Sequence, residues 1–217
     1  MTKRLLVAYA TGSGSTAEVA AAIAAELAVE GTAVDVRLAR EVEAVDAYSG
    51  VVLGSSIRVG RWLPDAVDFL EDFGDTLADV PVAYFTTCLT MVTDDEDSRR
   101  IVMAYLEPIR QLAPEVHPVG LGLFAGSLSP NMQQIMPGHP GPFGDFRNWE
   151  AIRAWAAEIR PALLAGEVRL AAPIVLTGAV LSYTDMSGLN LQHVDLQEAE
   201  LVEATLRDAD LLGADLR

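Results

Sequence analysis

The segment Leu5-Leu6-Val7-Ala8-Tyr9-Ala10-Thr11-Gly12-Ser13-Gly14-Ser15-Thr16-Ala17 joins an apolar run to a loop rich in glycine and hydroxyl groups. Residues 5–9 read as a short strand buried on both sides. From Thr16 to Glu30 the apolar residues recur at the spacing of one helix face. The segment therefore predicts a strand, a loop and a helix in succession, which is the unit of parallel α/β sheets.

The rest of the first 165 residues repeats this alternation. Further apolar runs predict strands over residues 33–38, 50–53, 81–86 and 116–124, and helical spacing predicts helices over residues 63–73, 98–112 and 149–163. Strands separated by helices favour right-handed crossovers and a parallel sheet covered on both faces. We therefore expect a doubly wound α/β domain over residues 1–165.

The end of the chain follows a period of five residues. The central positions of eight consecutive repeats are Leu181, Met186, Leu191, Leu196, Leu201, Leu206, Leu211 and Leu216. A step of five residues advances about 140° around an α-helix, and it alternates faces in a flat strand, so neither element buries these residues together. A chain that turns about 90° at each repeat stacks them along one axis.

This pattern resembles the pentapeptide-repeat family, which implies a short right-handed quadrilateral β-helix over residues 174–217, after a linker over residues 166–173. Because eight repeats make only about two coils, we expect a second copy of the chain to cover the open end, which predicts a homodimer. The alternative is an appendage that packs on the first domain.

Composition excludes several classes of protein. The 217 residues are 51% hydrophobic, and 15 basic against 31 acidic residues give a net charge of −16. This charge repels phosphate backbones, so no nucleic-acid partner is expected. No apolar run is long enough to span a bilayer, and Cys88 is the only cysteine. We expect a cytoplasmic protein with no integral membrane segment and no metal site.

The loop between the first strand and helix is suited to a phosphate. A helix N-terminus offers free N–H groups and partial positive charge, and four hydroxyl side chains lie around it. The loop lacks the Gly-Lys-Ser/Thr of a Walker A motif, whereas Gly12-x-Gly14-x-x-Ala17 also matches a dinucleotide fingerprint. A ring of hydroxyls favours a terminal phosphomonoester, so FMN is preferred to NAD.

The same residues resemble the flavodoxin family. Its N-terminal signature is matched by Val7, Tyr9, Thr11, Gly14, Thr16, Ala20 and Ile23, whereas Ala8 stands where a larger apolar residue is usual. The resemblance implies a five-stranded sheet of order 2-1-3-4-5. It also implies that the FMN phosphate is held by Thr11, Gly12, Ser13, Gly14, Ser15 and Thr16.

The resemblance places the flavin ring against the loops after the third and fourth strands. The cofactor-binding residues expected there are Ser55, Ser56, Ile57, Arg58, Val59, Gly60, Thr87, Cys88, Leu89 and Gly126. Gly60 can adopt positive φ, and hydroxyls such as that of Thr87 can bond the polar edge of the ring. Arg58 would raise the reduction potential or meet an anionic substrate; the alternative is a surface arginine that faces carboxylates.

Three segments are similar to the flavodoxin branch that contains menaquinone-dependent protoporphyrinogen IX dehydrogenase. They are residues 51–58, residues 124–128 and residues 145–149. The resemblance implies an FMN-dependent oxidoreductase that passes electrons from an apolar or planar small-molecule substrate to an acceptor such as a quinone or a redox protein. The proline- and glycine-rich segment from Ser127 to Phe146 could cover such a substrate or merely lie on the sheet edge. The alternatives are a flavodoxin-type electron carrier and a non-catalytic interaction module that uses the repeats.

Overall fold

A computed structural model describes residues 2–128 and 142–166, and parts of the C-terminal segment: residues 182–183, 186–187, 196–207, 209 and 211. The chain divides into two compact units, Met1–Arg169 and Leu170–Arg217. Each unit is considered by itself.

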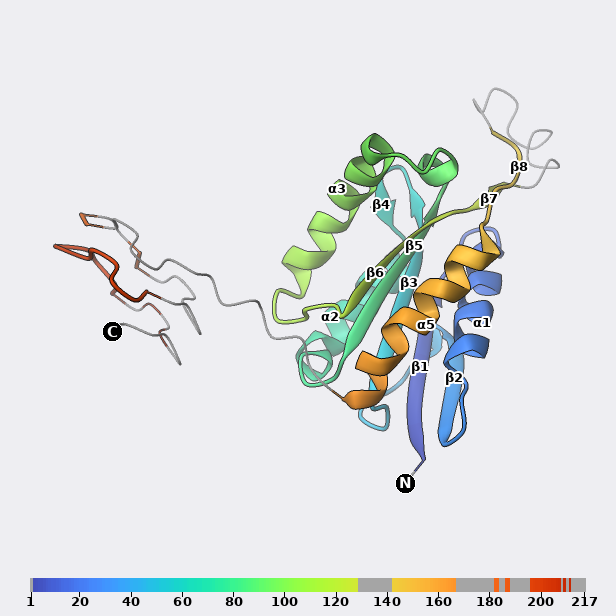
Figure 1. Ribbon diagram of the computed structural model, residues 1–217, viewed down its shortest axis with the longest axis horizontal. Helices are drawn as coiled ribbons and strands as arrows, with labels where there is room; N and C mark the ends of the chain where they lie inside the picture. Colours follow the sequence, from blue (N-terminus) through green and yellow to red (C-terminus); the bar gives the residue numbers. More distant parts are fainter. Residues whose placement is uncertain are drawn as a thin grey trace. The chain divides into compact units, whose positions relative to one another are not determined.

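The first unit contains a parallel sheet with helices on both faces (Figure 1). Its parallel strands run in the order β2-β1-β3-β5-β6, which confirms the order expected from the sequence; their bounds are β1 Lys3–Ala10, β2 Thr32–Leu38, β3 Gly50–Arg58, β5 Val82–Cys88 and β6 Gly120–Ala125. A two-residue strand that the sequence did not predict, β4 (Arg61–Trp62), turns back antiparallel to the end of β3.

The four helices of the described part lie in two layers. Helices α1 (Ser15–Leu27) and α5 (Trp149–Ala165) share one hydrophobic core, and helices α2 (Pro64–Leu77) and α3 (Glu96–Leu112) contribute to the other. Strand β1 contributes side chains to both cores: Leu5 and Val7 pack on the α1 side, whereas Leu6 and Ala8 pack on the α2 side. Successive side chains of a strand point to opposite faces, so a central strand buried on both sides is apolar throughout.

Several expected boundaries move. Helix α2 extends to Leu77 and α5 to Ala165, and the last strand of the sheet starts at Gly120 rather than at residue 116. Helix α3 begins within the acidic run at residues 94–97, where the Asp95 carboxylate accepts a hydrogen bond of 2.8 Å from the Ser98 N–H. This contact caps the helix, because it satisfies one of the N–H groups that its first turn leaves free.

The described part of the second unit shows the five-residue period in its hydrogen bonds. The N–H of Ala199 donates to the carbonyl of Leu196, and five residues later the N–H of Ala204 donates to the carbonyl of Leu201. The third residue of each turn, Glu198 and Glu203, has a φ of 55°, as a type II turn requires.

Neighbouring coils are joined by longer-range hydrogen bonds. The N–H of Tyr183 donates to the carbonyl of Val202 at 2.9 Å, and that of Met186 donates to Thr205 at 2.8 Å. Each bond spans 19 residues, close to the length of four repeats. Met186 and Leu196 are buried, and the central residues Leu201, Leu206 and Leu211 pack against them, which is the stacking that the repeat predicts. The homodimer remains a prediction.

Gly54, near the end of β3, provides a test of the packing between sheet and helices. A Cβ at this position would lie 2.0 Å from the ring of Phe85, which is itself 1% exposed. We expect Gly54→Ala to lower the free energy of unfolding by roughly 1–3 kcal/mol, because the ring has no room to retreat. Urea denaturation followed by circular dichroism measures the change.

Gly74 in α2 is the matched control. A Cβ there would meet only the Cβ of Ala113 at 3.7 Å, an ordinary contact. Gly74→Ala should therefore raise the stability by up to about 1 kcal/mol through helix propensity. Equal effects of the two substitutions would contradict the packing described here.

Candidate cofactor-binding site

The loop after β1 turns sharply into α1. Gly14 precedes the helix with φ 95°, a left-handed conformation that favours glycine, and its N–H donates to Thr11 Oγ1 at 2.9 Å. The hydroxyl oxygen of Thr11 therefore accepts a hydrogen bond that helps to shape the turn. Because Gly14 has no side chain, only its backbone lies at the point where the chain enters α1.

The first turn of α1 leaves backbone donors without a protein partner. Ala17 donates to the carbonyl of Gly14 at 3.0 Å, whereas the N–H groups of Ser13, Ser15 and Thr16 donate to no described residue. Ser15 is 8% exposed and Thr16 is fully buried. Buried N–H groups are costly to leave unpaired, so this turn suits an acceptor from outside the described residues.

A cleft of about 230 Å³ opens beside this turn. It lies where β1, β3 and β5 end, because the carboxyl ends of parallel strands meet at one edge of the sheet. Its described lining consists of Gly12, Ser13, Ser15, Ser56, Ile57, Arg58, Leu63, Thr87, Cys88, Leu89, Gly126, Ser127 and Leu128.

Ten of the sixteen cofactor-binding residues expected from the sequence line this cleft. The other six, which lie beside it without lining it, are Thr11, Gly14, Thr16, Ser55, Val59 and Gly60. Ser55 is fully buried, and its hydroxyl donates to the carbonyl of Ser56 and accepts from the N–H of Leu63, both at 2.9 Å. Its role is to hold the hairpin of β3 and β4 closed.

Val59 and Gly60 form the tip of that hairpin. Their φ angles are 50° and 70°, and the Val59 side chain is 94% exposed. The positive φ expected at Gly60 is confirmed, but the tip turns the chain back toward Leu63 instead of lining the cleft. The sequence missed Leu63 for this reason, and it missed Ser127 and Leu128 because a two-residue strand carries no periodic signal.

Arg58 is the charged residue of the cleft lining. It is exposed at the end of β3 and forms no ion pair with a described carboxylate, and both the binding role and the alternative of a surface arginine that faces carboxylates stay predictions. Cys88 lies deeper, and burial raises the pKa of its thiol, so it stays protonated.

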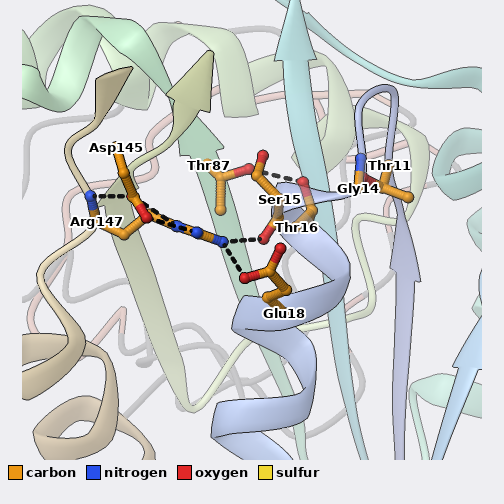
Figure 2. A network of polar contacts seen from close by, with 8 residues as sticks. All are labelled: Thr11, Gly14, Ser15, Thr16, Glu18, Thr87, Asp145 and Arg147. Atoms are coloured by element: carbon orange, nitrogen blue, oxygen red, sulfur yellow. Dashed lines mark hydrogen bonds and ion pairs between the residues drawn. The ribbon is translucent and has the colours of Figure 1, made fainter. Parts of the chain in front are cut away.

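Arg147 is a buried arginine that the sequence did not single out as a site residue. Its side chain is only 7% exposed and grips the Asp145 carboxylate with two hydrogen bonds, Nε to Oδ1 at 2.8 Å and Nη2 to Oδ2 at 2.6 Å (Figure 2). Its Nη1 donates to the carbonyl of Ser15 at 3.2 Å and pairs with Glu18 at 3.1 Å. The guanidinium also stacks 4.5 Å from the ring centre of Trp149.

These contacts fasten the cleft wall to the phosphate loop. Asp145 belongs to β8 (Gly144–Asp145), which pairs with β7 (Ser127–Leu128), and β7 lines the cleft. Arg147 therefore ties this ribbon to the first turn of α1. The hydrogen bonds from Arg147 hold the pKa of the Asp145 carboxyl below its usual range.

A family model described as "Flavodoxin domain" matches residues 6–136, more than half of the chain. The chain belongs to the flavodoxin-domain family. Eight pentapeptide repeats are also matched, over residues 174–197 and 184–217. No curated protein matches the sequence significantly.

Similar solved structures include flavodoxin 1 from Bacillus cereus, with 18% identity and a TM-score of 0.48, covering 72% of this chain and 96% of that one. A two-electron reduced flavodoxin from Megasphaera elsdenii has 15% identity and a TM-score of 0.47, covering 71% and 98%. A flavodiiron core from Synechocystis sp. has 16% identity and a TM-score of 0.48, covering 76% of this chain but only 37% of its own length. These likenesses carry no information on substrate or partner.

As a flavodoxin-domain protein the chain has FMN as its cofactor and a flavin-binding redox role. The residues fit this cofactor: unpaired, buried N–H groups at the start of α1 suit a phosphate, and the apolar side chains of Ile57, Leu63 and Leu89 suit a planar ring.

Two absences concern the described residues alone. None of their helices has the length and apolar character needed to cross a membrane. They contain no group of three or more metal-ligating side chains. Most of the Ser127–Phe146 segment, residues 129–141, lies outside the described residues, so its expected covering of a substrate is not addressed by the structure.

The Asp145 contact predicts a pH dependence of stability. A carboxyl whose folded-state pKa is lowered contributes stability above its unfolded pKa of about 3.9 and loses it as the pH falls through the lower folded value. Because the Asp145 side chain is about half exposed and solvent screens its charge, we expect Asp145→Asn to cost at most about 1 kcal/mol at pH 7. The difference from the wild type should shrink in urea denaturation as the pH falls below the unfolded pKa and through the lower folded one.

Glu107→Gln is the control, because Glu107 faces Arg110 at 3.7 Å with both side chains more than half exposed. Such a pair contributes little, so the substitution should be nearly neutral at every pH. A loss at Asp145→Asn that does not shrink at all across the acid range in which the carboxyl becomes protonated would rule out the ion pair as its cause.

Proposed function

We propose that the protein is an FMN-dependent oxidoreductase that passes electrons between an apolar or planar substrate and an acceptor such as a quinone. The proposal rests on the fact that one cleft combines two kinds of surface. Its end at α1 offers N–H groups that donate to no described residue, and the remainder of its lining includes apolar side chains. A molecule that fits both has an anionic tail and a flat apolar head, as FMN has.

The residues divide the work by position. The N–H groups of Ser13, Ser15 and Thr16 bind the phosphate, and Ile57, Leu63 and Leu89 bound the region for the ring. Bound flavin supplies the redox chemistry by accepting and donating electrons as pairs or singly. Arg58 sets the electrostatic potential at the mouth of the cleft, since no described carboxylate neutralises it.

A substrate-using enzyme is favoured over a plain electron carrier by the lining of the cleft. No aromatic side chain is among its lining residues, in the part of the chain that the structure describes. Small carriers cover the flavin with a tyrosine from the loop after β5, and here that position offers Leu89 and Thr90. A ring without an aromatic cover has a face available to a planar partner.

Purified protein tests the proposal directly. We expect visible flavin absorbance, release of FMN on denaturation, and rebinding of FMN by the stripped chain. After photoreduction without oxygen, a soluble quinone should restore the oxidised spectrum much faster than buffer alone. Protein that is colourless and takes up no added FMN would refute the proposal, and binding without faster reoxidation by quinone would leave only the carrier role.

Arg58 offers a sharper test of the electrostatics. We expect Arg58→Gln to lower the reduction potential of bound FMN by roughly tens of millivolts, because a positive charge near the ring favours electron uptake. Arg61→Gln is the control: it removes the same charge from the residue directly opposite Arg58 in the hairpin, which does not line the cleft. Spectroelectrochemical titration of both variants gives the comparison, and equal shifts would remove Arg58 from the site.

A further inference from the structure

Arg147 joins two parts of the first unit that meet at the cleft. It follows β8, whose partner strand β7 lines the cleft, and its guanidinium reaches the first turn of α1 (Figure 2). The Arg147 side chain is 7% exposed, whereas every other arginine in an ion pair between described residues is at least 30% exposed. Burying a charge is costly unless partners compensate, so the contacts of Arg147 fix its place.

The guanidinium makes contacts in two directions. Toward the ribbon formed by β7 and β8, Nε and Nη2 donate to the two carboxylate oxygens of Asp145. Toward α1, Nη1 donates to the carbonyl of Ser15 and pairs with Glu18. The planar fork of arginine allows both at once, because its donors point in fixed and different directions, whereas lysine has a single ammonium group. Arg147 is therefore a connector between the ribbon and the helix.

Two further contacts hold the ribbon at its base. The N–H of Phe146 donates to the carbonyl of Gly126 at 3.2 Å, and the N–H of Gly126 donates to the carbonyl of Cys88 at 3.1 Å. These bonds fasten the ribbon to the end of the sheet. Its own pairing covers two residues in each strand, and so short a pair of strands is marginally stable by itself. The position of the ribbon relative to α1 therefore relies on Arg147.

The cleft is bounded by both elements that Arg147 connects. Ser13 and Ser15 line it beside α1, and Ser127 and Leu128 of the ribbon line it as well. Movement of the ribbon away from α1 would therefore open a way out for a bound ligand. Arg147 is not among the described lining residues, so its effect on a ligand passes through the position of the ribbon.

We propose that Arg147 is a positioning residue that sets how long the cofactor stays bound. By fastening the ribbon to α1, it keeps Ser127 and Leu128 at the edge of the occupied cleft. The inference rests on the proposed FMN site. Most changes in affinity at one binding site appear in the dissociation rate, and a contact that retains a ligand acts on that rate directly. Loss of Arg147 should therefore raise the dissociation rate of FMN far more than it changes the association rate.

Arg160 in α5 provides a matched control. Its Nη1 donates to the carbonyl of Glu26 at 2.9 Å and pairs with the Glu26 carboxylate at 3.2 Å. Like Arg147, it binds a backbone carbonyl and a carboxylate of α1, but its partner belongs to the last turn of that helix, and neither residue lines the cleft. Arg160→Met therefore removes a comparable contact to the same helix and leaves the ribbon untouched.

Rates of FMN release from the loaded full-length chain, followed by the fluorescence of free FMN after dilution, test the proposal. We expect Arg147→Met to raise the dissociation rate roughly 10- to 100-fold, as for the loss of hydrogen bonds to a charged group, and to change the association rate less than about threefold. Arg160→Met should change the dissociation rate less than about twofold. Asp145→Asn breaks the connection from the ribbon side and should speed release several-fold, and it replaces Arg147→Met if that variant does not fold.

Arg147→Lys separates the connection from the charge. It keeps the positive charge near the cleft but lacks the fork, so we expect release nearly as fast as from Arg147→Met. Release at the wild-type rate from Arg147→Lys would assign the effect to charge and overturn the proposal. An unchanged rate in Arg147→Met, or an equal increase in Arg160→Met, would overturn it as well.

Hydrogen exchange of the stripped chain distinguishes failure of this inference from failure of the proposed function. Arg147→Met should lower the protection of backbone amides in peptides that cover β7 and β8, and leave the protection of β1 and β3 as in the wild type. A wild type that takes up no FMN refutes the proposed function, while a loss of protection confined to the ribbon would still support the connection. FMN binding with unchanged release from Arg147→Met refutes the retention role alone.

Discussion

Backbone N–H groups that are buried at the start of a helix must find an acceptor, and this requirement organises the whole site. In most helices a side-chain cap meets part of it, as Asp95 does for α3 and Asn148 does for α5. Helix α1 has Gly14 at the same position, and glycine has no side chain with which to cap. The first turn of α1 therefore leaves N–H groups that an anionic ligand such as the proposed FMN phosphate would satisfy.

The sheet topology brings the other parts of the site to this helix end. Strands β1, β3 and β5 are neighbours and parallel, so the loops that follow them open at one edge although the strands end at Ala10, Arg58 and Cys88. Two contacts then connect the loops to one another: the Thr16–Thr87 hydrogen bond across the cleft floor and the Arg147 contacts along its wall. The phosphate loop is therefore held from two sides by residues far from it in sequence.

The sequence predicted what depends on local pattern. Apolar alternation placed the strands of the sheet, and the five-residue period identified the tail, whereas the anion site expected at the hydroxyl-rich bend after Ala10 stays a prediction. It could not show that Ser55 and Thr11 use their hydroxyls on the chain itself, because both bonds depend on how a turn closes. Nor could it show the burial of Arg147, whose partner Ser15 lies 132 residues away. Residue type indicates which chemistry is available, and only the fold shows which groups are already engaged.

The repeats of the second unit form a structure that can be lengthened by adding further repeats. Its turns recur every five residues and its longer hydrogen bonds connect one circuit of the chain to the next. Duplication of a whole repeat leaves every later central residue facing the axis, whereas insertion of a single residue shifts every later residue out of the five-residue register. The tail can therefore gain or lose whole repeats of five residues during evolution without a change in the flavodoxin domain that precedes it.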